Sequence, residues 1–154
     1  MISFEEAGRF LDEEAAALPE EIFRDLNGGV NLLPDTKRDA DGMYILGMYF
    51  HNAMGRYVEI YYGSFREVFR FESDEAVRRE LGKTLRHELT HHLEGLAGDR
   101  SLERWDEQRR AELLAAMRGS APDSPLFAGG YTGPGGTSVP RRRRRPGPGA
   151  DGRR

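Results

Sequence analysis

The feature that most constrains this chain is a long amphipathic segment, which we predict to be a helix from Ser73 or Asp74 to about Leu96. Its apolar residues recur at four-residue steps and form one stripe: Val77, Leu81, Leu85, Leu89 and Leu93. Gly95 and Gly98 should end the helix. We expect a small sheet and further helices to pack against this stripe.

Two segments rich in Ile, Val, Tyr and Phe precede this helix. Met43 to Phe50 and Arg56 to Tyr62 are predicted to pair as an antiparallel hairpin, because the polar residues 51–55 between them can form its loop. Residues 34–42 are predicted to be a polar linker. The other predicted elements are a helix from Ser3 to Leu18 with a Ser3/Glu6 capping box, a short helix from Pro19 to about Asn27, a strand at Val30–Leu33, a helical turn at Phe65–Phe71 and a last helix at Leu102–Met117.

Composition changes sharply near the end of the chain. Of the 33 residues after Ala121, six are Pro and eight are Gly, which suit neither helix nor strand interiors. Residues 141–154 carry seven Arg and one Asp, so the overall net charge of −3 divides into an acidic body of −9 and a basic tail of +6. We therefore expect one domain over residues 1–118 and a disordered Gly-, Pro- and Arg-rich tail over 119–154.

Several protein classes are excluded at this point. No apolar run approaches the roughly 20 residues that a membrane helix needs, and the first ten residues are acidic where a signal peptide would be basic and then apolar. We expect a cytoplasmic protein without a membrane span. Because the chain has no Cys, any metal must be bound by His, carboxylates, carbonyls or water.

Three of the four histidines lie in the run His87-Glu88-Leu89-Thr90-His91-His92, inside the long predicted helix. A four-residue separation brings His87 and His91 to within about 40° around the helix axis and one turn along it, so both imidazoles can bind one ion. Glu88 follows the first of these ligands, which suits a base that takes a proton from a metal-activated water. The alternative is three solvated histidines on a polar helix.

These residues resemble the minimal zincin-like metallopeptidases of bacteria. The resemblance covers about residues 2–114 and includes Ile2-Ser3-Phe4-Glu5-Glu6, Leu18-Pro19-Glu20-Glu21, the hairpin and, above all, the doubled histidine of the HExxHH run. It implies an α+β, minimal zincin-like fold in which a small mixed sheet with a hairpin packs against the HExxH helix and flanking helices. It also implies that His87 and His91 bind Zn²⁺ and that Glu88 is the catalytic base.

The third ligand is less clearly marked. The family pattern often has Gly three residues and an acid six residues after the second histidine, where this chain has Glu94 and Ala97. The segment from Asp99 to Leu102 resembles the family's acid-x-x-Leu segment, displaced by a short insertion, so the resemblance assigns the third ligand to Asp99. Glu103 and Asp106 are rivals, and all three acids could instead be solvated residues at a helix start.

Other polar residues near the motif have weaker claims. His92 lies about 100° around the helix from His91, so a supporting hydrogen bond or a contact with a neighbouring element fits it better than the same ion. A hydroxyl of Tyr57, Tyr61 or Tyr62 could stabilise an oxyanion, although aromatic residues on short strands more often pack or pair. The resemblance also implies that the strand from Arg56 to Tyr62 is an edge strand that aligns an extended peptide.

The function that these features favour is a zinc-dependent metallopeptidase, a hydrolase acting on peptides or unfolded proteins, with Glu88 as general base. A metal-binding interaction module without peptidase turnover is the alternative. A third hypothesis is weak nucleic-acid or anionic-surface binding by Arg141–Arg145, which the acidic body opposes. Because no aromatic residues are interleaved with this arginine run, a disordered tail with incidental charge is the favoured interpretation of it. Oligomeric state is left open.

Overall fold

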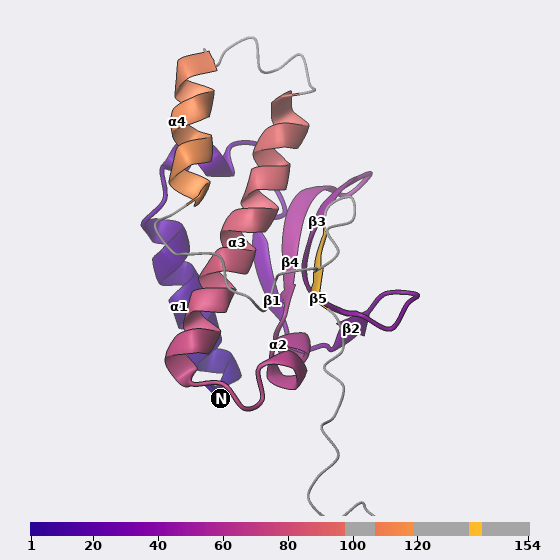
Figure 1. The fold of residues 1–154 in the computed structure, drawn as a ribbon. Helices are drawn as coiled ribbons and strands as arrows, with labels where there is room; N and C mark the ends of the chain where they lie inside the picture. The colour runs from indigo at the N-terminus through magenta and orange to yellow at the C-terminus, as the bar shows by residue number, and fades with distance from the viewer. Residues whose placement is uncertain (98–106, 119–135, 140–154) are drawn as a thin grey trace, which may run out of the picture.

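The computed structural model describes residues 1–97, 107–118 and 136–139, which form an α+β domain. In chain order the elements are α1 (Phe4–Ala16), the 3₁₀ helix η1 (Glu20–Phe23), β1 (Val30–Leu33), β2 (Lys37–Arg38), β3 (Tyr44–Asn52), β4 (Gly55–Tyr61), α2 (Tyr62–Val68), α3 (Asp74–Ala97), α4 (Glu107–Arg118) and β5 (Gly136–Val139). In Figure 1, α3 lies between the sheet on one side and α1 and α4 on the other. The α+β class and the mixed sheet confirm the expectation at that level.

The sheet has the order β1-β4-β3-β2, and β5 also pairs with β3. Strands β3 and β4 form the predicted hairpin, with a loop shortened to Ala53 and Met54 and with Asn52 opposite Gly55. Gly55 has a φ of +110°, a conformation that suits glycine at such a tight turn. Strand β2 was not predicted, because its two residues lie in a polar stretch and pair with the start of β3.

The prediction that Arg56 to Tyr62 forms an edge strand is wrong. Strand β4 lies inside the sheet, since it pairs with β3 on one side and in parallel with β1 on the other. The short segment Val30–Leu33 was correctly predicted as a strand, but its partner could not be identified from local sequence. A strand that is paired on both sides has no free backbone groups for a peptide.

The apolar stripe of α3 is buried as predicted, since all five of its residues have no exposed surface. On the sheet side, the absence of a side chain at Gly47 of β3 lets α3 approach closely. A Cβ at Gly47 would lie 2.8 Å from Cγ2 of Thr84 and 3.4 Å from Cγ of Glu88. This close approach fixes which side of α3 faces β3.

Helix α1 begins as the capping box predicts. The hydroxyl of Ser3 accepts a hydrogen bond from the backbone N–H of Glu6, and the Glu6 carboxylate accepts one from the backbone N–H of Ser3. Arg86 of α3 then binds Glu14 of α1, with 3.1 Å between Nη1 and Oε2. This pair ties α1 to α3 close to the histidine run.

Three predicted boundaries need correction. The second short helix is the four-residue η1 and not a helix to Asn27. Helix α2 begins directly after β4, at Tyr62 and not at Phe65, because the chain turns into a helix where the β1–β4 pairing ends at Tyr61. Of the last predicted helix the structure describes residues 107–118 as α4, and residues 102–106 lie outside the described part.

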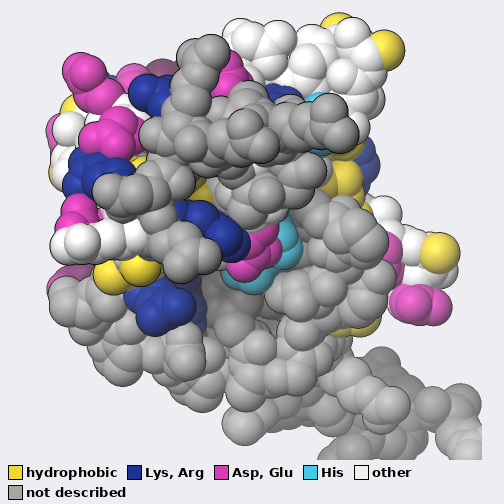
Figure 2. Space-filling model, turned by 90° about the horizontal axis from the view of Figure 1, so that it is seen from above, with side chains coloured by type: hydrophobic (Ala, Val, Ile, Leu, Met, Phe, Trp, Pro, Cys, Tyr) yellow, Lys and Arg dark blue, Asp and Glu magenta, His cyan; other side chains and the backbone are white. Residues whose placement is uncertain are grey.

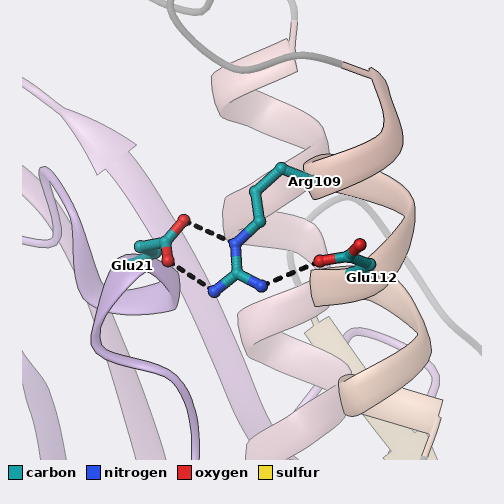
Figure 3. Close-up of polar contacts among 3 residues, drawn as sticks. All are labelled: Glu21, Arg109 and Glu112. Atoms are coloured by element: carbon teal, nitrogen blue, oxygen red, sulfur yellow. Dashed lines mark hydrogen bonds and ion pairs between the residues drawn. The ribbon is translucent and has the colours of Figure 1, made fainter.

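Helix α4 is tied to η1 by Arg109 (Figure 3). The guanidinium of Arg109 donates to both carboxylate oxygens of Glu21 and also to Glu112 one turn along α4. The hydrogen bonds that Glu21 accepts from Arg109 lower the pKa of Glu21 below its ordinary value. Leu113 and Met117 are buried and belong to the main hydrophobic core, so α4 packs on the rest of the described domain.

The tail also takes part in the fold at one point. Gly136–Val139 forms β5, which pairs antiparallel with the first half of β3, from Tyr44 to Met48. The expectation of a tail without structure is therefore wrong for these four residues. The rest of the segment from 119 onward, with Arg141–Arg145, lies outside the described residues. None of the helices that the structure describes is long and apolar enough to cross a membrane.

Candidate metal centre

His87 and His91 lie one turn apart on α3, and their rings meet edge-on through their Nε2 atoms. Their Nε2 atoms are 3.1 Å apart, and the ring planes are nearly perpendicular, at 84°. Two nitrogens bound to one tetrahedral zinc at the usual bond lengths lie about 3.3 Å apart. The observed separation is close to that spacing, and two neutral rings at 3.1 Å can also share a hydrogen bond.

The environment of His87 favours the neutral ring that a metal requires. Burial, and secondarily the neighbouring His91, lower the pKa of His87 to about 4. The ring is therefore uncharged at neutral pH and keeps a lone pair for a ligand bond. Zinc binding at pH 7 would not have to displace a proton from this side chain.

His91 is the more accessible member of the pair, with 25% of its side chain exposed. Its second ring nitrogen, Nδ1, lies 3.7 Å from Oε2 of Glu94, slightly too far for a hydrogen bond. A carboxylate beside the outer nitrogen of a histidine ligand is a common way of orienting the ring. On the end of the molecule shown in Figure 2, a histidine and an acidic side chain lie next to each other at the surface.

Glu88 has no exposed surface and lies on the side of α3 that faces β3. Its Cγ would be 3.4 Å from a Cβ at Gly47, so the start of this side chain lies over the middle of β3. The backbone thus places Glu88 one residue from His87 and against the strand beside the site. A buried carboxylate at this point is sheltered from bulk water.

His92 makes separate contacts and does not join His87 and His91. It has no exposed surface, its Nε2–H donates to the backbone carbonyl of Arg24 at 2.7 Å, and its Nδ1 accepts from the hydroxyl of Tyr49 at 3.0 Å. Burial lowers its pKa. This confirms the predicted supporting hydrogen bond. Sequence reasoning missed Tyr49, because nothing in its local pattern distinguishes it from the other aromatic residues of the hairpin.

The three tyrosines considered as oxyanion donors have other hydrogen-bond partners. Tyr62 donates to the carbonyl of Ile2 at 2.6 Å, Tyr61 donates to Glu59 at 2.7 Å, and the hydroxyl of Tyr57 accepts from Asn52 at 3.1 Å. Tyr57 also stacks on a neighbouring aromatic ring of the hairpin. Their contacts therefore match packing and pairing roles.

The third ligand is not defined by these contacts. Asp99, Glu103 and Asp106 all lie in 98–106, outside the described residues. In the part of the chain that the structure does describe, no three His, Asp or Glu side chains come together as a metal site. Within that part, His87 and His91 remain the two candidate nitrogen ligands.

Comparison with known proteins gives a relative but no activity. No family model matches the chain, and no curated protein does. A solved structure that it resembles is a conserved hypothetical protein from Thermo thermophilus, with 33% sequence identity and a TM-score of 0.56, covering 62% of this chain and 98% of that one. That description names no metal, substrate or reaction. Because the identity extends over nearly all of that protein, this chain belongs to the same family as the conserved hypothetical protein.

Proposed function

We propose that this chain is a zinc-dependent metallopeptidase with a minimal zincin-like fold. The observation that carries the proposal is the 3.1 Å separation of the Nε2 atoms of His87 and His91 on α3, with the buried Glu88 beside them. The helix holds both rings one turn apart, and its packing on β3 and α1 fixes its orientation. The site is therefore built on rigid elements, as positioned chemistry requires.

The residues fit a zinc ion in number and kind. His87 and His91 would each bind through Nε2, and a carboxylate of the next segment would complete the protein ligands, for which Asp99 is our choice over Glu103 and Asp106. Two histidines and one carboxylate are a common donor set for catalytic zinc, with a fourth position for water. When bound, zinc would supply Lewis acidity that favours loss of a proton from water and polarises a peptide carbonyl.

Glu88 would act as the general base in this reaction. A carboxylate next to a ligand can accept the proton from the attacking water and pass it to the leaving amine. Its burial against β3 keeps competing water away and limits the positions that the carboxylate can take. Glu88 would thus be the catalytic residue, and His92 with Tyr49 would help to hold α3 on the sheet.

The substrates would be flexible peptides or unfolded proteins, cleaved in the cytoplasm. A domain of this size forms a shallow site, so an extended chain can reach the pair of histidines more easily than a folded protein can. The edge of β3 lies next to α3, and its backbone groups are suited to aligning such a chain by β-pairing.

A cleavage assay with matched variants tests this proposal. Wild-type protein loaded with zinc should cleave an unstructured, fluorescently quenched peptide library. Glu88→Gln should keep the metal and lose cleavage by at least about a hundredfold, because an amide cannot accept the proton. Glu75→Gln, an exposed substitution on the same helix, is the control and should behave as wild type.

Two outcomes would contradict the proposal. If Glu88→Gln cleaved as fast as wild type, Glu88 would not be the base. If wild type held zinc through His87 and His91 but cleaved no peptide, the chain would be a metal-binding interaction module without turnover.

A further inference from the structure

Strand β5 lies at the place where a peptide substrate would pair. It adds to β3 on the edge away from β4, next to the helix that carries the histidines, and α3 contacts both strands. In its register Thr137 is opposite Gly47, and Gly136 is opposite Met48. Gly47 is the residue against which Glu88 packs. The tail therefore runs one strand spacing, about 4.8 Å, from the backbone beside the proposed base.

The pairing of β5 is short and interrupted. Only four residues take part, the register shifts between Ile45 and Gly47, and β5 pairs with no other strand among the described residues. Gly136 has a low strand propensity, and Pro140 directly follows the last paired residue. We expect a strand with these properties to be held weakly on β3. Residues 119–135 separate β5 from α4 in the sequence, so β5 can dissociate from β3 while the rest of the domain stays folded.

We infer that β5 is an internal competitor for the β3 edge: the tail segment Gly136–Val139 occupies in cis the backbone groups that an extended peptide would use. The part of the inference that concerns cleavage rests on the proposed function. The occupation of the β3 edge by β5 does not require that the chain cleave peptides. Because the competitor belongs to the same chain, its effect does not depend on protein concentration. Binding of a partner to the tail, or cleavage within it, would open the edge.

Proline substitution in β5 tests the occupancy. In an antiparallel strand, the backbone N–H groups of successive residues point alternately toward and away from the neighbouring strand. Either Thr137 or Ser138 therefore donates to β3, and replacing both, Thr137→Pro with Ser138→Pro, removes that donor. The control pair, Ala150→Pro with Asp151→Pro, places the same change in the tail outside β5. Both variants are made in the full chain.

Hydrogen exchange is the first measurement. We expect the proline pair in β5 to remove protection from amides in Tyr44–Met48 that face β5, while Val58 and Ile60 of β4 stay protected and the control matches wild type. Unchanged protection in Tyr44–Met48 would overturn the inference. So would a fall in melting temperature of more than about 10 °C, because β5 would then be a structural part of the domain.

A peptide added in trans is the second measurement. A synthetic peptide with the sequence of residues 134–141 should restore protection at Tyr44–Met48 in the β5 proline variant and bind it more tightly than it binds wild type. The same peptide with proline at both central positions should not. Failure of the matching peptide to bind the opened edge would also overturn the inference.

Cleavage is the third measurement. If the edge is about 80% occupied in cis, opening it should raise kcat/KM for a peptide about fivefold, mainly through KM. An equal kcat/KM in wild type and the proline variant would contradict competition. An absence of cleavage in every variant, with the exchange and binding results as expected, would reject the peptidase proposal and leave the cis occupancy standing.

Discussion

The Nδ1 atom of His92 lies 3.0 Å from the hydroxyl of Tyr49, and this contact joins the histidine run of α3 to the middle of β3. The other nitrogen of the same ring bonds the carbonyl of Arg24, so His92 links α3 to the sheet and to the segment after η1. Both ring nitrogens are used in these bonds. This explains why the third histidine of the run is fully buried while His91 next to it is partly exposed.

Removing the Tyr49 hydroxyl should therefore destabilise the domain and leave His87 and His91 in place. Tyr49→Phe leaves Nδ1 of His92 buried without its donor, and we expect a loss of about 1–2 kcal/mol in the free energy of unfolding. Chemical denaturation measures this. Tyr57→Phe, which removes a hydroxyl from an exposed hydrogen bond, should change stability by less than about 0.5 kcal/mol. An equal loss of unfolding free energy in Tyr49→Phe and Tyr57→Phe would show that the buried hydrogen bond stabilises the domain no more than the exposed one does.

The close approach of α3 to β3 depends on Gly47. Gly47→Ala places a Cβ 2.8 Å from Cγ2 of Thr84 and 3.3 Å from the carbonyl oxygen of Glu59, so we expect a destabilisation of about 1–3 kcal/mol. Adding Thr84→Ser removes Cγ2 and should restore part of the loss. Gly8→Ala is the control with the opposite sign, because its Cβ would be 3.8 Å from Leu32 and alanine favours the helix. The melting temperatures of these variants and of wild type test the prediction. An unchanged melting temperature in Gly47→Ala would refute the steric argument.

The contact of α4 with η1 should weaken in acid. The pKa of Glu21 is lowered by Arg109, so the pair contributes stability above the ordinary carboxyl pKa and loses it as pH falls through the lowered value. We expect the protection factors of the α4 amides, which are corrected for the intrinsic exchange rate, to fall over that acidic range in wild type. Glu21→Gln should give faster exchange in α4 already at pH 7, whereas Glu20→Gln, an exposed neighbour, should not. Identical α4 exchange in the two variants would contradict the account.

The third ligand can be identified by zinc titration of three variants. Asp99 is the first carboxylate after the two glycines that follow His91 in the sequence, and a short side chain there can return to the ion without another helical turn. We expect Asp99→Ala to weaken zinc binding by at least about tenfold and Glu103→Ala and Asp106→Ala to do less. A larger effect of either rival would show that the assignment across the short insertion is wrong, while the roles of His87, Glu88 and His91 would be unaffected.

The parts of the fold that sequence predicts well are those whose signal is local. Three features are each determined by a short stretch of consecutive residues, and the structure contains all three: the apolar stripe of α3, the capping box of α1 and the hairpin. The pairing of β1 with β4 and of β5 with β3 joins residues far apart in the chain, and no periodicity within either strand identifies its partner. The family resemblance implied an edge position for Arg56–Tyr62, and the Pro and Gly content implied an unstructured tail. Neither source identifies these long-range strand partners.

The same division holds for the site. The spacing of His87 and His91 predicts their convergence, because the helix alone determines it. Tyr49 lies 43 residues before His92, and the carbonyl of Arg24 lies 68 residues before it, so these partners depend on how the hairpin and η1 pack on α3. Backbone acceptors such as that of Arg24 carry no sequence signal.

The measurement that tests the central claim most directly is a zinc titration of the metal-free protein and of two histidine variants, which gives the number of zinc ions bound per chain and their affinity. We predict that wild type binds about one zinc per chain and that His91→Ala loses binding near micromolar zinc, because the ion would keep only one helix-borne nitrogen. His51→Ala, an exposed histidine on β3, should bind as wild type does. Equal zinc binding by His91→Ala and wild type would contradict the assignment of this site.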